Sequence, residues 1–244
     1  MALFSSIDGS YIVPPAGRYL ASGYAADVYQ LDDNKSLALK RPKSYPGDLS
    51  GNRHFRGLVD NERRIYELLG PHDGILKFYG CPDEETGALK LEYADGGDLC
   101  GYITTQPRPS DAHRFEMIRL LSTTWLYIYA RHVLIQDINT DNVLVHRGMP
   151  KVGDFTQAIV YPGGCPPPQH DFWIDIIGIG CVLYSIEKWE VFDYDYFSDQ
   201  RWPEPADLRS VEGMALGPVI TKCWERGYTC MQDFHDHVMR LLKL

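Results

Sequence analysis

The feature that most constrains the fold of this chain is a pair of short apolar runs, 142–145 and 149–152, joined by a turn that contains a glycine. Two such runs on either side of a glycine-bearing turn predict a β-hairpin. Polar residues lie at the open ends of this hairpin: Asp137 and Asn142 before or at the start of its first strand, and Asp154 after its second. Because a hairpin brings its two ends together, we expect two carboxylates and a carboxamide to converge.

This expected cluster has the composition of a site for phosphoryl transfer. Carboxylate and carboxamide oxygens are ligands that suit Mg²⁺, and a carboxylate that binds no metal can orient an attacking hydroxyl. Taken singly, an aspartate or asparagine is more often a turn former or a helix cap. The ordered combination of Asp-x-x-x-x-Asn, two short strands and Asp-Phe is much rarer, so it favours a catalytic interpretation.

Size, composition and charge narrow the class of protein. The chain has 244 residues, of which 44% are hydrophobic and 23% charged, values typical of one globular domain with a full core. Its formal net charge of −9 argues against a nucleic-acid binder, since phosphate contacts need clustered Lys and Arg. The sequence shows neither an apolar run of membrane-spanning length nor a secretion signal. We therefore expect neither nucleic acid nor a membrane among its partners.

The six cysteines are scattered along the chain without paired Cys-x-x-Cys spacing. This pattern favours neither a zinc site nor a disulfide framework, and it predicts reduced thiols. Because reduced thiols are the rule inside cells, we expect an intracellular protein, cytoplasmic or nuclear.

The first part of the chain has the pattern of a β-sheet with one helix. Apolar alternation and short apolar runs predict five strands, over 18–22, 27–31, 36–41, 74–79 and 88–92. A polar segment, 42–57, predicts a loop. Apolar residues at helical spacing before Gly70 predict a helix over 60–70.

The rest of the chain is mainly helical in pattern. Apolar periodicity predicts four helices, over 111–132, 174–186, 219–224 and 231–242. Ser110 is the expected cap of the first of these helices, and the second is apolar on nearly every side, so we expect it to be buried. Gly96 and Gly97 predict a linker that leads to Asp98 as a helix cap, and Asp171 is a further expected cap.

The order of these segments resembles that of the eukaryotic protein kinases. Matching residues occur at six places: Lys40, Glu62, Asp137, Asn142, Asp154 and Asp175. Lys40 ends a Leu-Ala-Leu-Lys strand that is similar to the family's Val-Ala-Ile-Lys, and Asp137 and Asp154 lie in segments that resemble its catalytic loop and Asp-Phe-Gly motif. The small size also resembles kinase-like proteins frequent in fungi. The resemblance implies an α+β, bilobal, single-domain fold, with an N-lobe of about 1–93, a hinge of about 92–98 and a helical C-lobe of about 99–244.

The resemblance also implies roles for the matching residues in an ATP- and Mg²⁺-dependent phosphotransferase. Lys40 is implied to bind the phosphates of ATP and to be held by Glu62. Asn142 and Asp154 are implied to hold Mg²⁺. Asp137 is implied to orient the substrate hydroxyl or to accept its proton.

A second group of residues is implied to bind the nucleotide or to support the site. The nucleotide-binding residues of this group are Gly23, Val28, Ala38, Glu92, Ala94, Asp98 and Leu144. The glycine lies in the expected phosphate loop, the backbone near Glu92 and Ala94 is implied to bind the adenine edge, and Asp98 the ribose. Asp175 is implied to hold the catalytic loop by hydrogen bonds.

Five departures from the family pattern bear on activity. The expected phosphate loop keeps only the middle glycine, Ile135 and Gln136 stand in place of His-Arg, and Asn139 stands where many relatives carry a lysine. Thr156 replaces the glycine after Asp-Phe, which restricts the backbone there. Only about twenty residues separate this motif from Asp175, without an Ala-Pro-Glu, so the segment is short for a peptide-docking shelf.

Three functions are compatible with this pattern. The favoured prediction is a kinase that phosphorylates Ser or Thr hydroxyls of a protein, because no residue expected to bind metal or to position the nucleophile is lost. The missing arginine and the short segment predict constitutive rather than switched activity. The alternatives are a pseudokinase that acts as a nucleotide-binding or interaction module, and a small-molecule kinase, which needs no peptide shelf.

Overall fold

The computed structural model describes residues 4–5, 11–12, 17–163 and 165–242. These residues form two compact units. The first contains the described residues up to His72, with Leu76–Tyr93 and Asp154–Gln157, and the second contains Asp73–Ile75, Ala94–Gly153 and the described residues from Ala158 onward. Across the described ranges, no helix is both long and apolar enough to cross a membrane.

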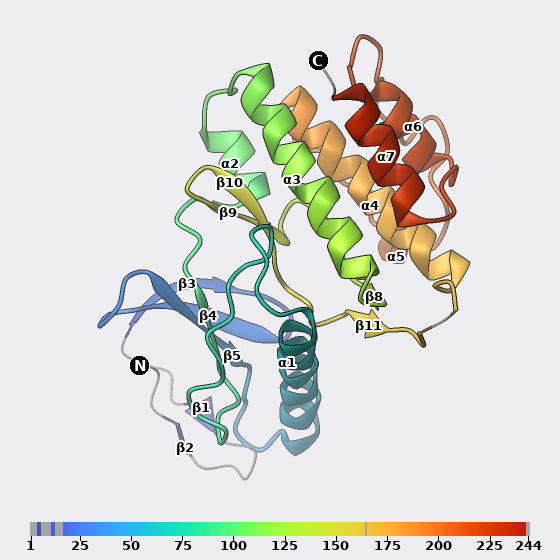
Figure 1. The fold of residues 1–244 in the computed structure, drawn as a ribbon. Helices are drawn as coiled ribbons and strands as arrows, with labels where there is room; N and C mark the ends of the chain where they lie inside the picture. The colour runs from blue at the N-terminus through green and yellow to red at the C-terminus, as the bar shows by residue number, and fades with distance from the viewer. Residues whose placement is uncertain (1–3, 6–10, 13–16, 164, 243–244) are drawn as a thin grey trace. The chain divides into compact units, whose positions relative to one another are not determined.

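An antiparallel four-stranded sheet forms the centre of the first unit (Figure 1). Its strands pair in the order β3 (Gly17–Ser22), β4 (Ala26–Leu31), β5 (Leu37–Pro42) and β6 (Leu89–Glu92). Their bounds confirm four of the predicted strands to within one residue. A separate ribbon pairs β1 (Phe4–Ser5) with β2 (Tyr11–Ile12).

The prediction of a fifth strand over 74–79 is wrong. This segment makes only isolated bridges, from Ile75 to Val152 and from Phe78 to Leu91. Because its two ends bond to different partners, no continuous ladder forms along it.

Helix α1 (Leu49–Leu69) begins earlier than the sequence predicts, and the expected loop is wrong over 49–57. Asp48 caps the helix, since its side chain accepts a hydrogen bond from a first-turn N–H. The buried apolar face becomes regular only from Val59, so periodicity could not reveal the first turns. The helix ends at Gly70, whose φ of 65° favours glycine.

The inner face of α1 packs against β5 (Figure 1). Residues three or four positions apart make up most of this buried face: Val59, Glu62, Ile65, Tyr66 and Leu69. One of them is a carboxylate, and a buried carboxylate needs a cation or hydrogen-bond donors.

The second unit is mainly helical. Its helices are α2 (Leu99–Thr105), α3 (Asp111–Tyr129), α4 (Gln169–Lys188), α5 (Tyr196–Asp199), α6 (Gly217–Trp224) and α7 (Met231–Leu241). The long helices α3 and α4 lie side by side, with α7 against α3 and α6 against α4 (Figure 1). All four helices predicted in this region are present. Ser110 caps α3 as expected, but Asp171 lies in the first turn of α4 and Pro168 occupies the cap position.

The hairpin that the sequence predicts is present in the second unit. Strands β9 (Val143–His146) and β10 (Met149–Val152) pair antiparallel, and β7 (Gly97–Asp98) pairs with β9. The turn residues Arg147 and Gly148 both have positive φ, 52° and 75°, which is the conformation of a tight type I′ hairpin turn. A further short pair joins β8 (Val133–Leu134) to β11 (Ile159–Val160).

Candidate active site

In the first unit, one ammonium group binds two carboxylates. Nζ of Lys40, on β5, lies 2.7 Å from Oε2 of Glu62 on α1 and 2.9 Å from Oδ1 of Asp154. Lys40 is 8% exposed and Glu62 is fully buried. The structure thus confirms Glu62 as the partner of Lys40, while Glu67 pairs with Arg63 at the surface.

The charges of this group follow from burial and mutual attraction. Burial alone lowers the pKa of Lys40, but Glu62 and Asp154 outweigh that effect and hold its pKa above the ordinary value. Burial raises the pKa of Glu62, against the lowering effect of Lys40. Burial also acts to raise the pKa of Asp154, but Lys40 and Thr156 bring it below its ordinary value. An ammonium and an ionised Asp154 carboxylate are therefore present at neutral pH.

The segment around Asp154 fixes the direction of its carboxylate. Asp154 has a φ of 53°, and both the N–H and the hydroxyl of Thr156 donate to its Oδ1, at 3.3 and 2.8 Å. Phe155 is buried, with its ring centroid 5.0 Å from that of Tyr66. Since Lys40 and Thr156 both bind Oδ1, the oxygen that remains for a cation is Oδ2, on a side chain that is 36% exposed. This carboxylate fits the role of a Mg²⁺ ligand.

The predicted nucleotide-binding residues of the first unit lie on or beside the sheet. Val28 is opposite Lys40 across the β4–β5 pair, and Ala38 is two residues from Lys40, so all three side chains share one face. Gly23 lies in the exposed turn between β3 and β4. Glu92 ends β6. Their contacts with a nucleotide remain predictions.

In the second unit, a loop of residues 135–142, called here the Asp137 loop, holds the expected catalytic residues. Asp137 is exposed. Nδ2 of Asn142 donates to the backbone oxygen of Asp137 at 3.0 Å, which leaves the amide oxygen of Asn142 as the atom suited to a cation. The expected convergence of these two residues with Asp154, which belongs to the first unit, remains a prediction.

A buried carboxylate anchors the beginning of the Asp137 loop. Asp175, on α4, accepts hydrogen bonds from the N–H groups of Ile135 at 2.8 Å and Gln136 at 2.6 Å, and from the hydroxyl of Tyr129. Burial raises the pKa of Asp175 to about 6, while these hydrogen bonds oppose the rise. The predicted support of the loop by Asp175 is confirmed.

This anchor leads to a prediction about stability. Asp175→Asn replaces one acceptor oxygen by an NH₂ group that faces donors, so we expect unfolding free energy to fall by about 1–3 kcal/mol. Urea denaturation measures this change. Asp171→Asn, on the first turn of the same helix, is the matched control and should cost less than about 1 kcal/mol. Equal losses in the two variants would contradict the anchoring role.

Sequence reasoning missed three further supports of this loop. Asp193 accepts hydrogen bonds from the N–H of Thr140 at 3.2 Å and from its hydroxyl at 2.6 Å. The side chain of Asn139 binds groups within the loop. The loop also packs closely against α4 at Gly178, where an added Cβ would overlap the carbonyl oxygen of Ile138. The local Asn-x-Asp-Asn pattern could have indicated the support by Asn139. No sequence signal links Thr140 to Asp193, which lies 53 positions away.

The remaining predicted nucleotide-binding residues belong to the second unit. Asp98 caps α2 by accepting a hydrogen bond from the N–H of Gly101 at 2.6 Å, as the sequence predicts. The β7–β9 pair puts Asp98 opposite Leu144. Ala94 accepts a hydrogen bond from the N–H of Gly97 at 3.2 Å. The ribose and adenine contacts of these residues remain predictions.

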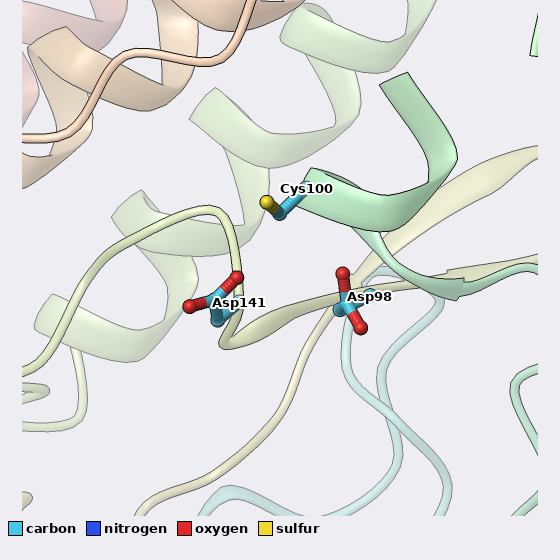
Figure 2. Close-up of side chains that lie close together, drawn as sticks. All are labelled: Asp98, Cys100 and Asp141. Atoms are coloured by element: carbon cyan, nitrogen blue, oxygen red, sulfur yellow. The ribbon is translucent and has the colours of Figure 1, made fainter. Parts of the chain in front are cut away.

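Asp98 is also part of a cluster with Cys100 and Asp141 (Figure 2). One ligand atom from each residue lies within 4.8 Å of the others. Burial, followed by the charge of Asp141, raises the pKa of Cys100, so the thiol keeps its proton at neutral pH. Three donors, one of them a protonated thiol and one the exposed carboxylate of Asp141, fall short of the four-ligand set of a structural zinc site. We therefore assign no metal to this cluster.

The first unit has an antiparallel sheet whose Lys40 pairs with Glu62 of helix α1. The second unit is helical and carries an anchored Asp-x-x-x-x-Asn loop. Together these features define a protein of the kinase fold. Residues 17–170, more than half of the chain, match the family model described as the protein kinase domain. The chain belongs to the protein kinase family.

The chain is also similar to several curated serine/threonine kinases. It is 27% identical over 191 residues to Aurora kinase A-A of Xenopus laevis, which covers 69% of this chain and 46% of that protein. It is 22% identical over 193 residues to an Aurora kinase of Yarrowia lipolytica, covering 69% and 50%. It is 25% identical over 157 residues to the serine/threonine-protein kinase Nek8 of Danio rerio, covering 55% and 22%. The matches thus span half or less of each of these relatives.

Proposed function

We propose that this protein is an ATP- and Mg²⁺-dependent phosphotransferase that phosphorylates Ser or Thr hydroxyls of a protein. The observation that carries the proposal is the buried Lys40, which binds both Glu62 and Asp154. Burying an ammonium and a carboxylate costs desolvation free energy that their attraction offsets only in part, so stability alone is a weak reason for this arrangement. Its use in this family is to bind ATP phosphates. Dependence on ATP also supports the expected intracellular location, in the cytoplasm or nucleus.

The proposal gives each residue a chemical task. ATP supplies the phosphoryl group, and Mg²⁺ neutralises its developing charge. Lys40 binds phosphate oxygens, while Glu62 keeps the ammonium in place. Asn142 and Asp154 offer one oxygen each to the cation. Asp137 orients the substrate hydroxyl and accepts its proton.

The substrate-contacting residues of the first unit are assigned by the same proposal. Gly23 lies near the phosphates, and Val28 and Ala38 contact the adenine, as their shared sheet face with Lys40 supports. In the second unit the proposal gives Leu144 an adenine contact and Asp98 a ribose contact. The backbone at Glu92 and Ala94 would bind the adenine edge.

A pseudokinase is the second candidate, and one observation favours it. Asn139 occupies the place where many relatives have a lysine near the transferred phosphate. A protein that binds nucleotide but transfers no phosphate would fit this loss. A small-molecule kinase would transfer phosphate to a metabolite and to no protein.

A thermal-shift titration with ATP tests the metal–nucleotide site. We expect ATP with Mg²⁺ to stabilise the native state by about 2.7 kcal/mol when its concentration is about 100 times the dissociation constant. Asp154→Ala removes a proposed metal ligand, so the Mg²⁺-dependent part of the shift should disappear. Asp33→Ala, at an exposed turn of the same unit, should leave it unchanged. Absence of any shift at millimolar ATP would contradict nucleotide binding.

A further inference from the structure

Asn139 lies in the Asp137 loop, and the resemblance to the kinase family implies no role for it. Its Nδ2 donates to Oδ1 of Asp137 at 2.7 Å. Its Oδ1 accepts the backbone N–H groups of Asp141 at 2.9 Å and Asn142 at 3.0 Å. One side chain thus connects the carboxylate of the expected catalytic aspartate with the main chain at the expected metal ligand.

From this geometry we propose that Asn139 is a positioning residue, which holds the carboxylate of Asp137 in the orientation that accepts a proton from the substrate hydroxyl. The inference rests on the proposed function and deepens it. It explains how a chain that lacks a lysine at this place can still direct its catalytic carboxylate.

The hydrogen-bond network determines which way the amide of Asn139 faces. Two backbone N–H groups point at one end of the amide, and only its oxygen can accept them. A flipped amide would put NH₂ against two donors and leave an oxygen facing the carboxylate of Asp137. The NH₂ group is therefore fixed on the side of Asp137.

Such a bond matters because Asp137 is exposed. An exposed carboxylate samples several rotamers, whereas a hydrogen bond from an anchored amide favours one of them. Holding a proton acceptor in reacting geometry lowers the barrier, and a displacement of about 1 Å can cost about 100-fold in rate.

The rest of the loop is anchored independently of Asn139. Asp175 binds the N–H groups at its beginning, and Asp193 binds Thr140. We therefore expect a substitution at Asn139 that keeps the acceptor oxygen to leave the protein folded and the path of the loop unchanged.

The first variant is Asn139→Asp, because it removes the NH₂ donor of the side chain while it keeps the acceptor oxygen. Aspartate keeps an oxygen for the N–H groups of Asp141 and Asn142 but offers no donor to Asp137. We expect kcat with a degenerate Ser/Thr peptide mixture to fall about 10- to 100-fold. KM for ATP and the melting temperature should change little. Asn34→Asp is the matched control, since Asn34 Oδ1 accepts the N–H and hydroxyl of Ser36 in an exposed turn.

A purely structural role makes a different prediction for Asn139→Ala, which places no second charge beside Asp137. If Asn139 only shaped the loop through its oxygen, Asn139→Ala would lower the melting temperature and raise KM but leave kcat at saturating substrate unchanged. That result would overturn the proposal.

Nuclear magnetic resonance tests the same bond without ATP or substrate. In ¹⁵N-labelled protein, Asp137→Ala should shift the side-chain NH₂ resonances of Asn139 and leave those of Asn34 in place. Unchanged Asn139 resonances would overturn the proposal even in an active enzyme. If the wild type transfers no phosphate while these resonances do shift, the bond between Asn139 and Asp137 stands and the proposed function fails.

Discussion

Replacing Asp137 by asparagine should reduce phosphoryl transfer by about 10²- to 10⁴-fold, the usual contribution of a positioned proton acceptor. Asparagine has nearly the same shape and still accepts the hydrogen bond from Asn139, but its amide oxygen does not take up a proton at neutral pH. Transfer of label from γ-labelled ATP to a Ser/Thr peptide mixture measures the loss. The thermal shift with ATP and Mg²⁺ should persist, because the proposed phosphate and metal contacts lie elsewhere.

The control for this variant must remove an aspartate charge far from the Asp137 loop. Asp236→Asn does so on the exposed face of α7, where the carboxylate of Asp236 accepts a hydrogen bond from the side chain of Gln232 at 2.9 Å. Its transfer rate should equal that of the wild type. Transfer that survives in Asp137→Asn would refute the role of Asp137. Loss of both transfer and ATP binding would point to misfolding of the loop.

Lys40→Met should have the largest effect on stability, a loss of about 3–5 kcal/mol of unfolding free energy. The substitution leaves Glu62 buried without its cation, and breaking a buried pair from one side costs about this much. Lys40→Met with Glu62→Leu removes both charges and should recover part of the loss. The matched control is Lys35→Met, because Lys35 and Asp32 form an exposed pair that contributes at most about 1 kcal/mol.

The pH dependence of Lys40→Met gives an independent check on the same pair. Without Lys40, the pKa of buried Glu62 in the folded state should rise further above its ordinary value near 4.5. A carboxyl with a raised folded pKa contributes stability below its unfolded pKa and loses it as pH rises through the folded pKa. The cost of Lys40→Met should therefore be smaller at pH 5 than at pH 8, as measured by urea unfolding. A cost independent of pH would show that Glu62 is not the charge left uncompensated.

Local patterns were sufficient to predict most elements of the fold. The strands from Gly17 to Pro42, the β9–β10 hairpin and the buried helix α4 all follow from alternation, turn chemistry and helical periodicity. The first turns of α1 could not be predicted this way, since they lack the regular apolar face that begins at Val59. The segment 74–79 is apolar like a strand, but whether it joins a ladder depends on partners far away in the sequence.

The candidate site was predictable to a similar degree, and for a similar reason. Lys40, Glu62 and Asp175 could be selected because each lies in a motif with a fixed place in its helix or strand, and their contacts are confirmed. The bonds of Thr156 to Asp154 and of Asp193 to Thr140 could not be predicted. They depend on the tertiary approach of side chains whose own sequence neighbourhoods carry no signal.

The close approach of Gly178 to Ile138 limits how this protein can be made more stable. A glycine inside a helix usually costs about 1 kcal/mol relative to alanine, so Gly178→Ala is an obvious step for an engineer or for natural selection. Here the methyl group would strike the residue that follows Asp137 and displace the loop on which the proposed chemistry depends. The helix-propensity cost of glycine at this point of α4 therefore cannot be recovered by Gly178→Ala, because the close packing of the loop leaves no room for a methyl group.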